Sequence, residues 1–73
     1  MIPINLLKPG ERGTIFDVGG TESTVHRLSE MGLRVGTCIR MIKSGNPCIL
    51  AIDDHRLSLR LDADLQILVD LPS

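Results

Sequence analysis

The sequence predicts a small, mainly β barrel that carries one short helix. Most of the chain alternates apolar and polar residues at strand spacing, turn residues interrupt it at short intervals, and a single segment has helical spacing. A chain of 73 residues forms one domain, here 1–73, and a domain of this size buries only about 60% of its unfolded surface. A barrel removes the unpaired edges of a small open sheet. We therefore expect a barrel of five to six strands.

The helix is predicted over about residues 22–31, and both of its ends carry recognisable signals. Thr21 or Ser23 suits the N-cap, because a short hydroxyl side chain accepts a hydrogen bond from a free backbone N–H. Gly32 fits the left-handed position that ends a helix, and Leu33 is the apolar residue that often packs back after it. Inside the helix, apolar residues recur at Val25, Leu28 and Met31.

The segment before the helix reads as one strand between two turns. Residues 2–7 are apolar, and Asn5 is placed to cap one helical turn there. Residues 8–11 have Pro second and Gly third, as in a tight turn. A strand is expected over 13–18, ended by the flexible pair Gly19-Gly20.

After the helix we expect strands that pair as consecutive hairpins. A strand at 37–43 leads into a turn at 44–47, and a two-residue turn is expected at Asp54-His55. The register then pairs Lys43 with Cys48, Met41 with Leu50, Ile39 with Ile52, Asp53 with Arg56, Ile52 with Leu57 and Leu50 with Leu59. The predicted core is Ile39, Met41, Leu50, Ile52, Leu57, Leu59 and Leu61; the opposite face carries Cys38, Arg40, Ile42, Ile49, Ala51, Ser58 and Arg60.

The chain ends in a predicted helical turn over 62–65, a last strand over 66–70 and a frayed end at 71–73. By the same register, Cys38 and Cys48 are roughly 16 Å apart along the strands. A disulfide needs Cα atoms within about 7 Å. We therefore expect both cysteines to remain reduced.

Composition argues against several classes of protein. The net charge is −1, so no electrostatic excess is available to hold a phosphate backbone, and nucleic acid is not expected as a partner. No apolar run approaches the ~20 residues that span a bilayer, so we expect a cytoplasmic protein that does not insert in membranes. No catalytic or nucleotide-binding motif is present. We expect a protein that is not an enzyme.

Short motifs stand in a fixed order along the chain. They are LKPG at 7–10, GTI at 13–15, GG at 19–20, RLSEMGL at 27–33, Gly36 and LSLR at 57–60. This pattern resembles that of the FeoA family of ferrous iron transport proteins, over about residues 7–69. The resemblance implies an SH3-like barrel that works in the cytoplasm with the membrane transporter FeoB, whose GTPase domain faces the same compartment. It also implies similarity to the C-terminal modules of some metal-dependent repressors, which leaves a stand-alone regulatory domain as a further possibility.

A partner surface is expected either at the helix or on the outer face of the sheet. The helix offers Arg27 and Glu30 with Met31 and Leu33 at its end, whereas the sheet offers Ile42 and Ile49. Peptide-reading SH3 domains use a groove lined by aromatic residues, and this chain has one Phe. A groove here would be aliphatic and would suit a hydrophobic helix or strand of a partner.

A metal site is the alternative function, because the expected register places Cys38 opposite Asp53 and near His55. A thiolate, a carboxylate and an imidazole together suit a divalent ion such as Zn²⁺ or Fe²⁺. The competing interpretation is purely structural: Cys38 is a small half-buried hydrophobic residue, Asp53 pairs with Arg56, and His55 belongs to an ordinary turn.

Overall fold

The computed structural model describes residues 1–62 and 64–72 and confirms a mainly β fold with one short helix. Its strands are β1 (Ile2–Pro3), β2 (Arg12–Gly19), β3 (Cys38–Lys43), β4 (Cys48–Ile52), β5 (His55–Leu59) and β6 (Gln66–Asp70). A 3-10 turn, η1 (Ile4–Leu6), follows β1, and α1 (Glu22–Glu30) lies between β2 and β3. Among the described residues, no helix is long and apolar enough to cross a bilayer.

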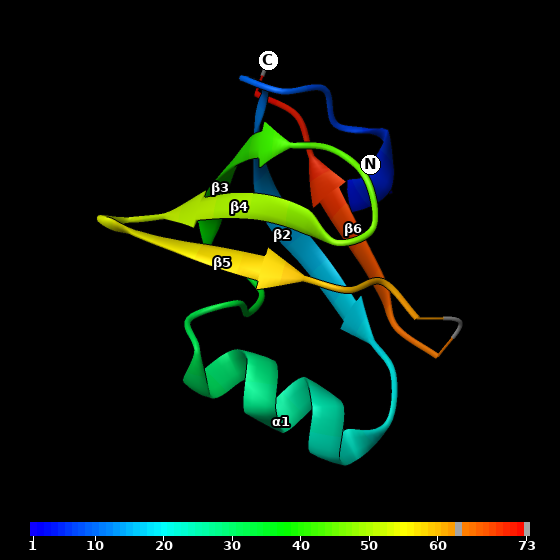
Figure 1. Cartoon of the computed structure of the whole chain (residues 1–73). Coiled ribbons are helices and arrows are strands. Elements are labelled where there is room, and N and C mark those ends of the chain that lie inside the picture. The colour runs from blue at the N-terminus through cyan, green and yellow to red at the C-terminus, as the bar shows by residue number, and fades with distance from the viewer. Residues whose placement is uncertain (63, 73) are drawn as a thin grey trace.

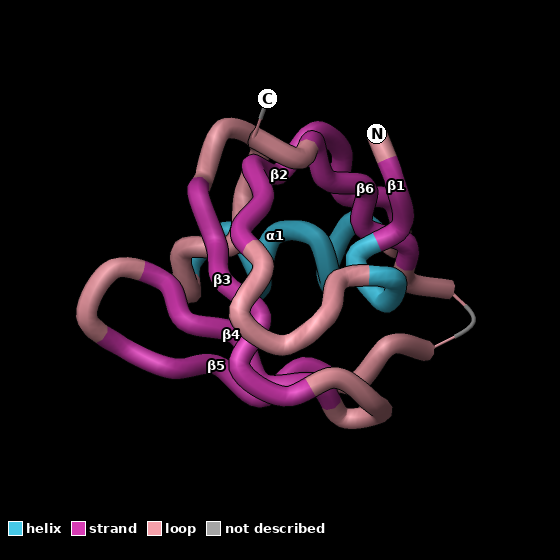
Figure 2. Tube along the Cα trace, turned by 90° about the horizontal axis from the view of Figure 1, so that it is seen from above, coloured by secondary structure: helices cyan, strands magenta, loops and turns pink. Residues whose placement is uncertain are grey.

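The strands form one antiparallel sheet in the order β1-β6-β2-β3-β4-β5, which curls into a small barrel (Figures 1 and 2). The short β1 was not predicted, because a two-residue strand has no alternation to read. It pairs Ile2 with Val69 of β6, which brings the two ends of the chain together. The sheet therefore ends at β1 on one side and at β5 on the other.

The hairpin register confirms one predicted pair and corrects others. Met41 lies opposite Leu50 as expected, but an irregularity at Ile42 places Lys43 opposite Ile49 instead of Cys48. A bulge of this kind adds one residue to one strand, and no hydrophobic pattern announces it.

The turn between β4 and β5 lies at residues 53–54, one residue before the predicted turn, and this shifts the pairing of the two strands by two positions. Ile52 pairs with His55, and Leu50 pairs with Leu57. Asp53 adopts a left-handed φ of 53°, which Asp tolerates better than most residues and which tight hairpin turns require. Because the shift is an even number of residues, every side chain stays on its predicted face.

Asn46, in the turn between β3 and β4, holds that turn against the segment that follows β5. Its side chain donates a hydrogen bond to the Leu61 carbonyl at 3.3 Å and accepts one from the Leu61 N–H at 2.9 Å. Two segments fifteen positions apart in sequence are thus joined. The predicted helical turn over 62–65 includes residue 63, which lies outside the described residues; Leu65 N–H donates to the Asp62 carbonyl at 3.0 Å.

Both ends of α1 are capped by the residues around it. Thr21 is the N-cap, and its hydroxyl accepts a hydrogen bond from the Thr24 N–H at 3.4 Å. At the other end Gly32 takes a φ of 97°, and the Leu33 N–H donates to the Leu28 carbonyl at 2.9 Å. This arrangement satisfies carbonyl groups that the helix leaves free. The predicted helix bounds are confirmed to within one residue.

The core is aliphatic and contains all but one of the side chains predicted for it. Leu50 and Val69 are fully buried, and Leu61, which was predicted to be in the core, is only half-buried at its margin. The fully buried side chains also include some that the strand pairing alone did not predict: Ile4, Leu7, Ile15, Leu33, Cys48 and Ile67. Burying each stabilises the fold by roughly 1.5–3 kcal/mol.

We expect Leu50→Ala to lower the free energy of unfolding by about 3 kcal/mol, because it opens a cavity where strands from both hairpins meet. Urea titration followed by far-UV circular dichroism measures this. Leu6→Ala is the matched control, because Leu6 is 59% exposed, and its effect should stay within about 0.5 kcal/mol. Similar losses for the two variants would contradict this account of the core.

Candidate partner-binding site

A groove of about 440 Å³ lies between α1 and β5 and continues over the segment that follows β5. We call it the α1–β5 groove. Figure 1 shows the two elements that flank it, with α1 below β5 in that view. The described residues that line it are Thr21, Thr24, Arg27, Leu28, Met31, Leu57, Ser58, Leu59, Arg60, Asp62, Asp64 and Leu65.

Helical periodicity explains how α1 supplies one wall of the groove. Thr24, Leu28 and Met31 are three or four positions apart, and residues at this spacing share one face of a helix. The start of α1 also lies tight against the far wall: a Cβ on Gly20 would stand 2.9 Å from the Asp64 carbonyl oxygen. Only glycine permits this approach without a shift of the backbone, and it closes one end of the groove.

The groove has an aliphatic floor and a charged rim. Leu28, Leu57 and Leu59 are each less than a tenth exposed, whereas Met31 is 42% exposed and forms the open end. Arg27, Arg60, Asp62 and Asp64 are exposed around it. Apolar side chains with convergent charged groups are the usual make-up of a recognition site.

The structure separates the helix residues that the sequence proposed for partner binding. Arg27 and Met31 both line the α1–β5 groove. Glu30 does not; its carboxylate lies 2.8 Å from His26 Nε2 on the exposed side of the helix. Leu33 is 1% exposed, so its inclusion among the surface residues was wrong. It packs into the core because the residue after a helix-ending glycine folds back onto the helix.

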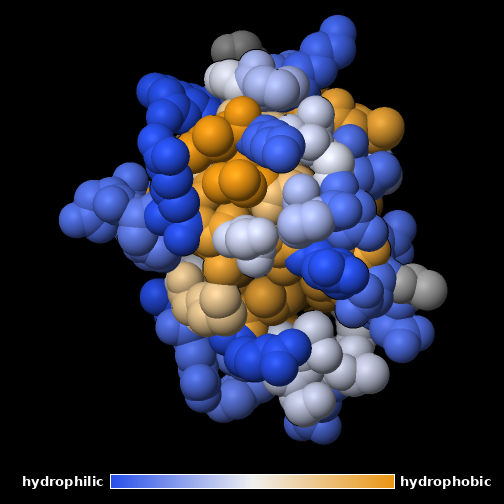
Figure 3. All heavy atoms as spheres, viewed as in Figure 1, coloured by the Kyte–Doolittle hydropathy of each residue, from blue (hydrophilic) through white to orange (hydrophobic). Residues whose placement is uncertain are grey.

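The second proposed surface, Ile42 with Ile49, lies on the outer face of β3 and β4. Both side chains are half-buried, and the irregularity at Ile42 brings Ile49 opposite Lys43. Figure 3 shows hydrophobic atoms in the middle of the face that Figure 1 presents, with hydrophilic side chains around them. Neither residue lines one of the hollows described here.

The three residues of the expected metal site are only partly brought together. Cys38 and Asp53 line one shallow hollow, but Arg12 and Arg40 line it too. His55 begins β5, where its Nδ1 lies 4.0 Å from Asp54 Oδ1. In the described part of the chain, no three His, Cys, Asp or Glu side chains are placed to hold an ion together.

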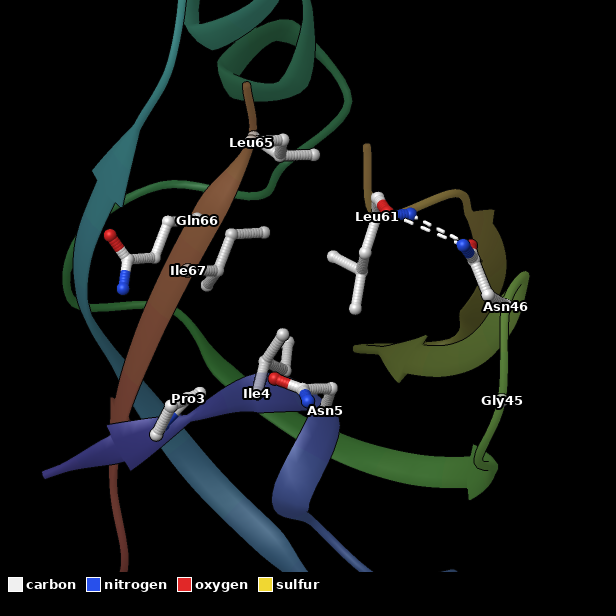
Figure 4. Close-up of a pocket in the computed structure, with 9 residues that line it drawn as sticks. All are labelled: Pro3, Ile4, Asn5, Gly45, Asn46, Leu61, Leu65, Gln66 and Ile67. Carbon is white, nitrogen blue, oxygen red and sulfur yellow. Dashed lines mark hydrogen bonds between the residues drawn. The ribbon is translucent and has the colours of Figure 1, made fainter. Parts of the chain in front are cut away.

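A larger hollow of about 620 Å³ lies where the N-terminal segment meets the turn that holds Asn46 (Figure 4). Ile4, Leu61 and Ile67 point toward one another there, while Gln66 points to the other side of β6. None of its described lining residues is charged. Its polar side chains are uncharged amides, and that of Asn46 is already bonded to Leu61, so the α1–β5 groove with its charged rim is the stronger candidate.

The two cysteines occupy different environments, and both are free. Cys38 is exposed on β3, whereas Cys48 is fully buried on β4. Burial raises the pKa of the Cys48 thiol above its ordinary value, and a backbone hydrogen bond opposes this more weakly. Cys48 is a core residue with no route to a partner.

Sequence reasoning missed the part of the groove that comes from β5 and from the segment after it. Arg60 was placed on the outer face of the sheet, and Asp62 and Asp64 were read only as turn residues. The polar alternation of Arg56, Ser58 and Arg60 was the available signal. It marks a strand with one solvated face, but not the helix that lies beside it.

The raised pKa of Cys48 predicts a loss of stability in alkali. The folded state holds the thiol proton more tightly than the unfolded chain, so the stabilisation is complete below about pH 8.5 and falls as the pH rises. The stability advantage of the wild type over Cys48→Ala should therefore shrink between about pH 7 and pH 10 in urea titrations. Cys38→Ala retains Cys48 and should show the wild-type pH dependence. An advantage that stays constant with pH would contradict this.

We expect no stoichiometric binding of Zn²⁺ or, without oxygen, of Fe²⁺ at Cys38, Asp53 and His55. The guanidinium groups of Arg12 and Arg40 line the same hollow as two of these residues and repel a cation. Equilibrium dialysis measures the stoichiometry. Binding of one ion per chain that Cys38→Ala or His55→Ala abolishes would overturn this expectation.

Comparison with known proteins gives two matches that agree with each other. The family model for the FeoA domain matches residues 2–71. The fold is similar to the crystal structure of an iron uptake regulatory protein (FeoA), with a TM-score of 0.77 and 22% sequence identity over 93% of this chain and 96% of that chain. No curated protein matches. The barrel predicted from sequence is thus the SH3-like fold of that structure, and the chain belongs to the FeoA domain family.

Proposed function

We propose that this chain is a cytoplasmic accessory protein of ferrous iron uptake that acts by contact with the cytosolic region of the transporter FeoB. Membership of the FeoA domain family supports the role in iron uptake, and the similar crystal structure is that of an iron uptake regulatory protein. The proposed role is protein–protein contact without catalysis.

The α1–β5 groove is the observation that carries this proposal. It combines an aliphatic floor with charged residues from two elements, and it contains Arg27 and Met31. An exposed methionine adapts its shape to a partner's side chains, and an arginine at the rim supplies a directional charged hydrogen bond. Such a surface recognises a protein segment and does not require a cofactor.

Capture of the purified cytosolic GTPase domain of FeoB by immobilised wild-type chain tests the proposal. We expect binding, and we expect Arg27→Glu combined with Met31→Ser to weaken it by about tenfold, since the pair removes a charged contact and an apolar one. Far-UV circular dichroism of the variant should be unchanged, because both side chains are exposed.

Glu30→Gln is the matched control, because Glu30 is on the same helix but outside the groove. It should bind like the wild type. If the wild type captures nothing, the proposed function is wrong. If the groove variant binds normally and Ile42→Ser with Ile49→Ser does not, the partner docks on the outer face of β3 and β4.

A further inference from the structure

β5 is the last strand of the sheet, so one edge of its backbone has no neighbouring strand. Along an antiparallel pair of strands, hydrogen-bonded residue pairs alternate with pairs that are not hydrogen-bonded. The pair that closes a two-residue turn, here Ile52 with His55, is hydrogen-bonded, so the pairs that contain Arg56 and Ser58 are not. The N–H and C=O groups of Arg56 and Ser58 therefore point away from β4. Among the described residues, no backbone group outside the ladders pairs with them.

This open edge faces the α1–β5 groove. Leu57, Ser58 and Leu59 belong to the groove's lining as well as to β5. The backbone of α1 approaches the strands at few places, so side chains rather than close backbone contact separate the helix from β5. A further strand needs a spacing of about 4.8 Å from β5. Its inward side chains would contact the aliphatic floor formed by Leu28, Leu57 and Leu59, and Met31 at the open end.

The charges around the edge indicate what kind of segment fits. Arg27, Arg56 and Arg60 are exposed, and in the part of the chain that the structure describes none of them takes part in an ion pair. Asp62 and Asp64 line the end of the groove beyond Arg60. Acidic residues of a partner would pair with the arginines, and a basic residue or an amino terminus would suit the two aspartates.

We infer that the α1–β5 groove binds an extended peptide segment of the partner protein, which adds to β5 as an antiparallel strand. The segment alternates apolar side chains, directed between β5 and α1, with acidic side chains opposite Arg56 and Arg60. Its amino-terminal end lies near Asp62 and Asp64. Main-chain hydrogen bonds to Arg56 and Ser58 provide affinity, and the alternating side chains provide specificity. The identity of the partner as FeoB rests on the proposed function, whereas the binding mode does not.

A labelled synthetic peptide tests the binding mode directly. It begins with lysine and continues with leucine at alternate positions and glutamate opposite Arg56 and Arg60. Fluorescence anisotropy should show saturable binding, and ¹⁵N NMR should show the shifts concentrated at the amides of Arg56 and Ser58. Arg56→Glu combined with Arg60→Glu should weaken binding by about tenfold or more. The matched control Arg40→Glu, on β3, should bind like the wild type.

Ser58→Pro removes the outward N–H without removing a hydrogen bond to β4, and edge strands accept proline at such positions. It should abolish peptide binding, while Ser58→Ala retains it. If Ser58→Pro does not fold, N-methylation of the peptide gives the same information: methylation at one set of alternate amides should abolish binding, and at the other set should not. Binding by folded Ser58→Pro, equal effects of both methylation patterns, or no binding to the wild type would overturn the inference.

Two further measurements separate this inference from the proposed function. If wild type and Ser58→Pro capture the FeoB domain equally, strand addition is wrong and the contact with FeoB stands. If the wild type binds the peptide as described but does not capture the FeoB domain, the groove stands and the proposed function is wrong. Sedimentation of the wild type alone should show a monomer; a dimer that Ser58→Pro abolishes would assign the edge to a second copy of this chain and overturn the inference.

Discussion

The fold depends on aliphatic side chains from distant parts of the chain meeting in one small volume. Ile15 on β2, Leu50 on β4 and Val69 on β6 are all buried, although more than fifty positions separate Ile15 from Val69 in sequence. No aromatic ring contributes, because the single Phe, Phe16, is 50% exposed. Aliphatic side chains stabilise the fold by leaving water and by packing closely, since they offer no hydrogen bonds or charges. The strands therefore have little freedom to move relative to one another.

That constraint decides which parts of the surface are available for recognition. Among the described residues the core side chains are almost fully buried, so we expect contact with other molecules at a sheet edge, over the helix or on the outer wall. One edge of the sheet is only the two-residue β1, whereas the other is the five-residue β5. Short edges resist unwanted pairing, and longer ones need cover. Arg56 and Arg60 place positive charge along that edge, which discourages pairing with segments that are not acidic.

The parts of the fold that follow from residue type and spacing were predictable from sequence. The helix and its caps follow from Thr21 and Gly32, and the buried faces of β3, β4 and β5 follow from alternation. The β4–β5 register was wrong by two positions, yet the core prediction survived, since an even shift leaves inside and outside unchanged. What tertiary packing decides was not predictable: the irregularity at Ile42 and the pairing of β1 with β6. The burial of Leu33 follows from its place after Gly32, a signal that was set aside when Leu33 was counted with the partner surface.

The candidate site was predictable only in part, for the same reason. Arg27 and Met31 were identified because they stand on the polar side and at the end of a recognisable helix. Arg60, Asp62 and Asp64 were not, because their role depends on which strand the helix lies beside. Likewise, Cys38 and Asp53 both line one hollow, but the two arginines beside them come from a strand pairing, Arg12 with Arg40, that was not predicted.

The local capping of α1 has a mechanical consequence. Its end groups are satisfied by Thr21 and by the Gly32-Leu33 turn rather than by the sheet, so moving the helix outward breaks none of these bonds. Leu28 and Leu33 are buried and hold the carboxyl-terminal half of the helix on the barrel, and the close approach of Gly20 to the Asp64 carbonyl holds its amino end. The helix is therefore capped independently of the sheet but packed against it at both ends. Widening of the space beside the sheet would then leave the secondary structure of the domain intact.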